Sequence, residues 1–252
     1  MTGRALSFGA VAADYERFRP GYPDELVDAV LAYADGEVRT ALEIGAGTGK
    51  ATRAFAARGI AVTATDPDAA MLAELRRHVP ASVRTVRGAF EELDPGATYD
   101  LVFAAAALHW TRPEGRWERV AGLLGPGGTF ASFGGQVCLA DDALEDAVRA
   151  AREPWLADDS IAPPDGSPPA SAMQWPGTEL LETDLFADVR QIRIERWMTM
   201  SAADFVSHLS TISAYLELAA DDRAQAFERI LAVLPETVAI VADLDLHLAR
   251  LA

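Results

Sequence analysis

Three glycines and an acid in the first third of the chain have the spacing of a nucleoside-binding site. Gly45, Gly47 and Gly49 follow a short apolar run, and Asp66 lies 19 residues after Gly47 at the end of another apolar run. A glycine-rich turn between a strand and a helix lets a ligand approach the backbone, and an acid about 20 residues on can accept hydrogen bonds from ribose hydroxyls. The pattern therefore predicts a cofactor that contains a nucleoside.

Three classes of cofactor compete for this turn. A phosphate-binding P-loop needs glycine where this chain has Ile44, and serine or threonine where it has Ala51. A dinucleotide fingerprint needs a third glycine where this chain has Lys50. Glu43 would repel a pyrophosphate, but it would not repel a cofactor that carries a sulfonium and an ammonium. The turn therefore favours a methyl donor, and a nicotinamide-dependent oxidoreductase stays open as the alternative.

Four segments of the first half, in the right order, resemble class I S-adenosylmethionine-dependent methyltransferases. They are residues 14–23 (DYERFRPGYP), 41–50 (ALEIGAGTGK), 99–110 (YDLVFAAAALHW) and 123–133 (LLGPGGTFASF). Within the family, the pair His109-Trp110 is similar to that of small-molecule enzymes such as trans-aconitate and juvenile hormone acid methyltransferases. Those enzymes esterify carboxylates.

This resemblance implies that S-adenosyl-L-methionine is the cofactor. Gly45 and Gly47 are expected beside its methionine part and ribose, Glu43 facing the methionine part, and Asp66 on both ribose hydroxyls. An arginine of the N-terminal segment is expected on the cofactor carboxylate, because a guanidinium fork suits that group. The expected cofactor residues are Tyr15, Arg19, Glu43, Gly45, Ala46, Gly47, Thr48, Asp66, Pro67, Met71, Ala89, Phe90, Ala104 and Ala105.

The resemblance also implies an in-line methyl transfer to an oxygen or nitrogen nucleophile of a small molecule, with a carboxylate favoured. We expect the substrate pocket to include Tyr22, His109, Trp110 and Trp175. His109 is the candidate catalytic residue, as a base or a hydrogen-bond donor; a half-buried histidine with a structural role is an equal alternative. Because such a transfer requires no particular catalytic residue, a non-catalytic S-adenosylmethionine-binding protein also stays open.

Alternating strand and helix patterns predict an α/β fold with helices on both faces of a parallel sheet. The family resemblance sharpens this to a Rossmann-like sheet of seven strands, mostly parallel with an antiparallel last strand, and a helical cap from the C-terminal half. We expect a single domain over residues 1–252: a lid and first helix (1–35), a cofactor-binding core (36–135), and the remaining sheet with cap insertions near 154–178 and 201–235. In the second half, the patterns predict strands at 189–199 and 237–248 and helices at 202–220 and 222–233.

The amino-acid composition limits the kinds of partner that we expect for this chain. With 38 acidic against 22 basic residues, the net charge is −16, which disfavours nucleic acid and an anionic membrane surface as partners. A single cysteine rules out an intrachain disulfide, and His78, His208 and His247 lack the spacing of metal ligands, so no metal is expected. No apolar run is long enough to span a membrane, and we expect a cytoplasmic protein. The oligomeric state is not predicted.

Overall fold

The computed structural model describes residues 8–94, 96–160, 163–168 and 171–252, and its centre is a seven-stranded sheet. The strand order is β3-β2-β1-β4-β5-β10-β7, in which β1, β2, β3, β4 and β5 pair in parallel and β10 runs antiparallel to both of its neighbours. The predicted seven-stranded fold with an antiparallel last strand is confirmed. The bounds are β1 (Thr40–Ile44), β2 (Ala61–Asp66), β3 (Arg84–Arg87), β4 (Tyr99–Ala105), β5 (Leu124–Gly134), β7 (Phe186–Ile194) and β10 (Leu244–Leu251).

Helices cover both faces of this sheet, as expected. Helices α2 (Asp24–Tyr33) and α3 (Lys50–Ala56) bury apolar side chains in one core cluster, and α5 (Arg116–Leu123) and α7 (Gly177–Leu181) bury theirs in another. Helix α4 (Ala69–His78) packs against β2 and β3. The central strands β1 and β4 are buried almost throughout, which is typical of a parallel sheet covered on both sides.

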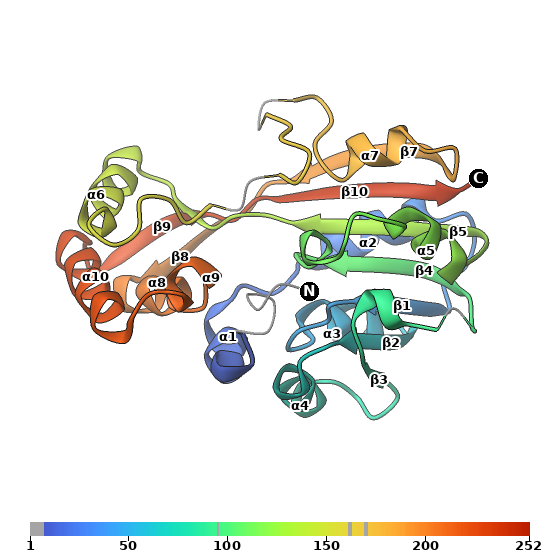
Figure 1. Cartoon of the computed structure of the whole chain (residues 1–252), viewed down its shortest axis with the longest axis horizontal. Helices are drawn as coiled ribbons and strands as arrows, with labels where there is room; N and C mark the ends of the chain where they lie inside the picture. Colours follow the sequence, from blue (N-terminus) through green and yellow to red (C-terminus); the bar gives the residue numbers. More distant parts are fainter. Residues whose placement is uncertain (1–7, 95, 161–162, 169–170) are drawn as a thin grey trace.

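A second layer of structure, which we call the cap, lies at one end of the main sheet (Figure 1). It contains a three-stranded sheet of order β6-β9-β8, which the sequence analysis did not predict, together with helices α6, α8, α9 and α10. The cap has its own apolar core, with Phe205, Tyr215 and Ile230 fully or almost fully buried. The bounds are β6 (Cys138–Leu139), α6 (Asp142–Arg152), β8 (Trp197–Ser201), α8 (Ala202–Leu209), α9 (Ser213–Leu216), α10 (Ala220–Val233) and β9 (Thr237–Val241).

Two predicted strands each turn out to be two strands in different sheets. The expected strand 189–199 is divided between β7 and β8, and the expected strand 237–248 between β9 and β10. The two links bend together, because the backbone of Arg196 and Ala242 is joined by a hydrogen bond of 2.9 Å and the Asp243 carboxylate accepts the Arg196 N–H. Alternation of polar and apolar residues indicates an extended chain, but it does not indicate which sheet each part joins.

The expected helix 202–220 is also wrong as a single element. It begins as predicted, with the Ser201 hydroxyl accepting the Asp204 N–H, but α8 ends at Leu209 and the short α9 follows. The hydroxyls of Ser210 and Thr211 donate to the carbonyls of Ser207 and His208. Such local side-chain bonds compete with helix continuation.

The N-terminal segment forms an arm between the cap and the cofactor half of the sheet. It consists of η2 (Phe8–Val11) and α1 (Ala12–Phe18), and it contacts α4 on one side and α8 on the other (Figure 1). Glu16 ties the arm to α3 through an ion pair of 2.6 Å with Arg53, and Lys50 donates to the Glu16 carbonyl at 2.6 Å. None of the helices in the described ranges combines the length and the hydropathy needed to cross a membrane.

Candidate functional site

A cavity of about 520 Å³ lies where the carboxyl ends of the parallel strands meet the arm and the cap. Asp66 and Ala105 line it from the sheet, Tyr15 from the arm, and Phe205 and Ile212 from the cap. A smaller recess of about 80 Å³ adjoins it and shares several of its wall residues. In open α/β sheets, ligands bind outside the carboxyl ends of the strands, so this is the expected place for a site.

The glycine-rich turn forms the boundary between the cavity and the recess. Gly45, Gly47 and Gly49 have φ angles of +65°, +55° and +85°, which glycine adopts without steric cost. At Gly45 a Cβ atom would lie 2.6 Å from the Cβ of Ala107, too close for any side chain. The backbone after β1 therefore passes directly under the loop after β4, and the turn is exposed to the cavity at Gly45 and Gly47.

Asp66 ends β2 and lines the cavity while being only 8% exposed. One carboxylate oxygen accepts the Gly47 N–H at 2.9 Å, and the other accepts the Asp68 N–H at 2.8 Å. Each oxygen keeps a second lone pair. Burial, aided by the negative charge of Asp68, raises the pKa of Asp66 to about 6. Donors such as two ribose hydroxyls would satisfy the remaining lone pairs, so Asp66 fits the role that the sequence predicts.

Glu43 lies in the recess and not in the main cavity. It is 1% exposed, its carboxyl accepts a hydrogen bond from the Thr52 hydroxyl, and burial raises its pKa to about 8. A positively charged ligand in the recess would lower that pKa, because an opposite charge favours the ionised form. Glu43 therefore has both a structural partner and a position beside the glycine turn, and its expected contact with a cofactor stays a prediction.

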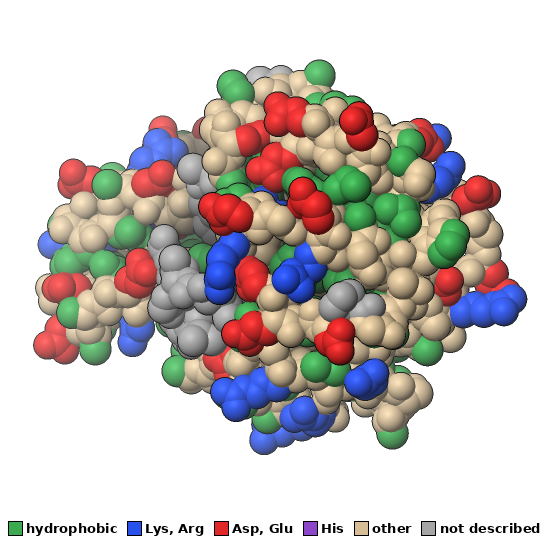
Figure 2. Space-filling view, turned by 45° about the vertical axis from the view of Figure 1, so that its right-hand side comes forward, with side chains coloured by type: hydrophobic (Ala, Val, Ile, Leu, Met, Phe, Trp, Pro, Cys, Tyr) green, Lys and Arg blue, Asp and Glu red, His purple; other side chains and the backbone are tan. Residues whose placement is uncertain are grey.

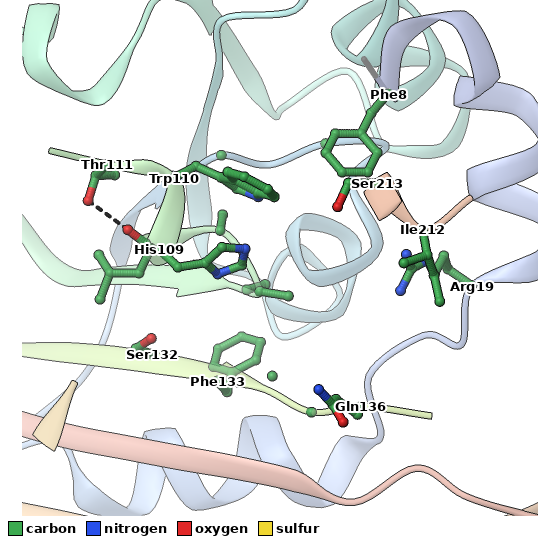
Figure 3. A pocket seen from close by; sticks show the side chains of 18 of the residues that line it. Phe8, Arg19, His109, Trp110, Thr111, Ser132, Phe133, Gln136, Ile212 and Ser213 are labelled. Carbon is green, nitrogen blue, oxygen red and sulfur yellow. Dashed lines mark hydrogen bonds between the residues drawn. The ribbon is translucent and has the colours of Figure 1, made fainter. Parts of the chain in front are cut away.

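His109 and Trp110 form one wall of the cavity, in η4 (Leu108–Trp110) after β4 (Figure 3). Their rings lie 4.5 Å apart. Burial, aided by the nearby Arg116 guanidinium, lowers the pKa of His109 to about 4, so the imidazole is neutral at pH 7. Among the described residues its Nε2 atom has no hydrogen-bond partner.

Arg116 is a buried cation behind this wall. Its Nη1 atom pairs with the Glu179 carboxylate at 3.0 Å, and its Nε and Nη2 atoms donate to the hydroxyl and carbonyl of Thr111. Its guanidinium carbon lies 5.3 Å from the ring centre of Trp175, which also lines the cavity. Thus Trp175, predicted for the substrate pocket, is held by a charge that also acts on His109.

Arg19 lies across the cavity from His109 and Trp110, on the same side as Ile212 (Figure 3). Its Nε atom donates to the Thr211 hydroxyl at 2.8 Å and its Nη2 atom to the Thr211 carbonyl at 3.1 Å. The guanidinium carbon lies 5.2 Å from the Tyr15 ring centre. Arg17, the other arginine of the expected lid segment, lies over Phe18 instead and does not line the cavity.

The remaining predicted residues divide between the two spaces. Pro67, Met71, Ala89 and Phe90 line the main cavity, and Ala46, Thr48 and Tyr22 line the recess. Tyr22, expected in the substrate pocket, packs on Phe133 at 5.0 Å between ring centres. Ala104 lines neither space, because its side chain is buried in the core beneath β4. The next residues, Ala105, Ala106 and Ala107, form that part of the cavity wall.

Several lining residues were missed by the sequence analysis. They come from the arm, from β5 and the residues that follow it, and from α8, α9 and the turn between them: Phe8, Ser132, Gln136, His208, Ile212 and Ser213. Phe8 contacts both Tyr15 and Trp110, with ring centres 6.0 and 6.1 Å away. The cap residues have no motif that could have identified them. Their place in the wall depends on how the cap folds back over the sheet.

Comparisons with known proteins find the same family in the part of the chain that holds the glycine turn. Residues 41–128 match the family model described as a methyltransferase domain. An uncharacterized methyltransferase of Mycobacterium tuberculosis is 41% identical over 124 residues, which cover 49% of this chain and 50% of that protein. An uncharacterized methyltransferase of Schizosaccharomyces pombe is 32% identical over 133 residues, 52% of each chain. The chain thus spans about half the length of the curated relatives it matches.

A solved structure extends the likeness of the fold to almost the whole chain. A candidate type II methyltransferase from Anaeromyxobacter dehalogenans superposes with a TM-score of 0.64 at 23% identity, covering 92% of this chain and 98% of that one. The resemblance to class I methyltransferases is therefore confirmed for the domain and the fold. The narrower resemblance to carboxylate-methylating enzymes stays a prediction.

Proposed function

Residues 41–128 form a methyltransferase domain within a class I methyltransferase fold, and from this premise we propose that the chain binds S-adenosylmethionine and transfers its methyl group to a small molecule. The proposal rests on the position and hydrogen bonding of Asp66. It is a buried carboxylate with no ion-pair partner among the described residues, and it faces a large cavity beside the glycine turn. Ribose hydroxyls would complete its hydrogen bonding there.

The proposed cofactor supplies an activated methyl group on a sulfonium, with a neutral leaving group. The protein's part is then to bind, to orient and to exclude water. Asp66 holds the ribose, the apolar side chains of Met71 and Phe90 contact the base, and Gly45 and Gly47 leave room for the chain that carries the sulfonium. The arm and the cap cover the cavity from solvent.

We favour a carboxylate as the acceptor. A carboxylate is already ionised at neutral pH and needs no base to remove a proton. His109, with a pKa of about 4, is a weak base and suits positioning better than proton removal. The Arg116 guanidinium near His109 favours a negative charge at this wall, although its pair with Glu179 reduces that effect.

The distribution of charge on the surface, like the size of the cavity, agrees with a small-molecule substrate. On the face shown in Figure 2, acidic and basic side chains are interspersed, and the whole chain has a net charge of −16. A nucleic-acid substrate would need a continuous basic surface to displace counterions. The proposal therefore includes no nucleic acid and no membrane as partner, and it places the protein in the cytoplasm.

Two measurements test the proposal against its alternatives. Titration calorimetry should detect binding of S-adenosylmethionine and S-adenosylhomocysteine and no binding of NADH; the reverse pattern would support a nicotinamide-dependent oxidoreductase. Incubation with a metabolite extract and an isotopically labelled methyl donor should then yield a labelled small molecule. Donor binding without any transfer to that extract would support the non-catalytic alternative.

A further inference from the structure

We propose that Thr211 of the cap is a positioning residue for the cofactor: it aims the Arg19 guanidinium at the carboxylate of the amino acid part of S-adenosylmethionine. This inference rests on the proposed function. It assigns to the cap a part in cofactor binding, in addition to its expected part in covering the acceptor.

The first step is the geometry of the guanidinium. Its Nε and Nη2 atoms form one edge of a planar fork, and both donate to the same residue, to the hydroxyl and the carbonyl of Thr211. The end of the fork, formed by Nη1 and the second hydrogen of Nη2, makes no hydrogen bond to any other described residue. A guanidinium can therefore hold Thr211 along one edge and a carboxylate along the other.

Arg19 also differs from the neighbouring cations in its ion pairing. Of the cations that line the cavity or the recess, Arg152 pairs with Asp159 and Lys50 with Glu16. Within the described ranges Arg19 has no carboxylate partner. It also lines both spaces, as do Gly45 and Gly47, beside which the methionine part of the cofactor is proposed.

The third step is rigidity. An arginine side chain loses rotamer entropy when it is fixed in one conformation. A residue that fixes it in advance reduces the free energy that a ligand must supply to order it. Thr211 is fully buried and cannot itself move freely, because its hydroxyl donates to the His208 carbonyl at 2.7 Å. The Tyr15 ring stacks on the guanidinium from another direction. His208 adds a hydrogen bond to the backbone of Phe18, so the cap holds the arm at two successive residues.

Arg196 is the rival for the carboxylate. It lines the recess and has no carboxylate partner for its guanidinium among the described residues, but it donates to the Gly21 carbonyl and the Met198 sulfur and does not reach the main cavity. The variant Arg196→Gln is therefore the matched control for Arg19→Gln.

The experiment compares two ligands by titration calorimetry: S-adenosylmethionine, and decarboxylated S-adenosylmethionine, which keeps the sulfonium and the amine but lacks the carboxylate. Arg19→Gln should weaken S-adenosylmethionine about ten- to a hundredfold, as expected for lost charge-assisted hydrogen bonds. It should change the decarboxylated ligand by less than about twofold. Thr211→Val should show the same selectivity at about three- to tenfold, and Thr211→Ser, which keeps the hydroxyl, should restore wild-type affinity.

Each other outcome has a clear meaning. Equal weakening of both ligands by Thr211→Val would show that Thr211 only supports the cap, and selective weakening by Arg196→Gln alone would move the carboxylate to Arg196; either overturns the inference. Failure of the wild-type protein to bind S-adenosylmethionine would instead overturn the proposed function. If Thr211→Val does not fold, Arg19→Lys makes the same test, because an ammonium cannot hold Thr211 and a carboxylate along two edges of one plane.

Discussion

The cofactor half and the cap are built in opposite ways. In the cofactor half, residues 40–134, α3 connects the paired strands β1 and β2, α4 connects β2 and β3, and α5 lies between β4 and β5. The glycine turn and Asp66 lie at the ends of the adjacent strands β1 and β2. In the cap, the three strands of one small sheet come from residues 138–139, 197–201 and 237–241. One half is assembled from local units, and the other from segments that are about 100 residues apart at their widest separation.

This difference matches a division of labour. The family model covers residues 41–128, entirely within the local half, and this half supplies the groups that suit a common cofactor. The cap supplies Phe205, Ile212 and Ser213 to the other wall of the cavity. Under the proposed function, we expect the local half to define the methyl donor. We expect the cap to define the acceptor, in addition to its proposed hold on Arg19.

The largest expected effect is a loss of stability from a substitution in the cap core, and its measurement tests whether the cap and the main sheet unfold as one unit. The links 195–196 and 242–243 carry two strands directly from the main sheet into the cap. Ile230→Ala in α10, at a fully buried position of the cap core, should lower the free energy of unfolding by about 2–5 kcal/mol.

Urea unfolding of this variant, followed by circular dichroism and by tryptophan fluorescence, should show a single transition, with Leu101→Ala in β4 as the matched control in the main sheet. Two separate transitions in the Ile230 variant would mean that the cap unfolds independently.

The next effect concerns the cofactor half alone. Asp66→Ala should weaken binding of S-adenosylhomocysteine by about 2–3 kcal/mol, because hydrogen bonds to a charged acceptor are lost. Asp100→Ala is the control at the amino ends of β1 and β4, opposite the ends that meet the cavity, where the carboxylate accepts the N–H groups of Arg39 and Thr40. Calorimetry should show unchanged affinity in that control. Wild-type affinity in the Asp66 variant would exclude the ribose assignment.

A smaller effect is expected where the two regions meet, at His109. If the acceptor is a carboxylate, His109→Gln should lower the rate about tenfold, or about 1.4 kcal/mol, through lost positioning. With a pKa of about 4, His109 does not change its protonation between pH 6 and 8, so it should add no pH dependence to the wild-type rate in that range. A loss of a thousandfold, with a rate that rises through a histidine-like pKa, would point to a hydroxyl acceptor and a general base.

The smallest expected effect is a change in hydrogen exchange in the arm that joins the two regions. Glu16 binds Arg53 on the cofactor side and Arg19 binds Thr211 on the cap side, so contacts within the chain already hold the arm on both sides. Hydrogen exchange over residues 8–22 should slow further, by a modest factor, when S-adenosylhomocysteine is bound. The edge strand β3 serves as the reference segment. Identical exchange in both states would show that the arm is not a lid.

Sequence reasoning predicted local structure best where that structure depends on a few particular residues. Gly45 and Gly47 could be placed because positive φ angles and close backbone approach require glycine. Asp66 could be placed because a strand that ends 19 residues after the turn is the neighbour of the first strand. The side chain of Ala104 is buried in the core on one face of the sheet, and the cavity wall begins at the next residue, Ala105. Alternation along a strand decides which face a side chain is on, and the expected contact of Ala104 with the cofactor stays a prediction.

The sequence by itself determined the glycine turn, the acid at the end of β2 and the parallel pairing of β1 with β2. It also determined that the lysine after the turn, Lys50, does not belong to a phosphate-binding loop. Each of these features depends on residues within one βαβ unit. Only the tertiary structure decided that residues 189–199 and 237–248 each divide between two sheets, and that Thr211 meets Arg19 across 192 positions of sequence. The alternation of polar and apolar residues shows that a segment is extended and which of its faces is apolar. It does not show which distant segment packs on that face. The cap is formed by such long-range contacts, so its structure could not be read from local patterns.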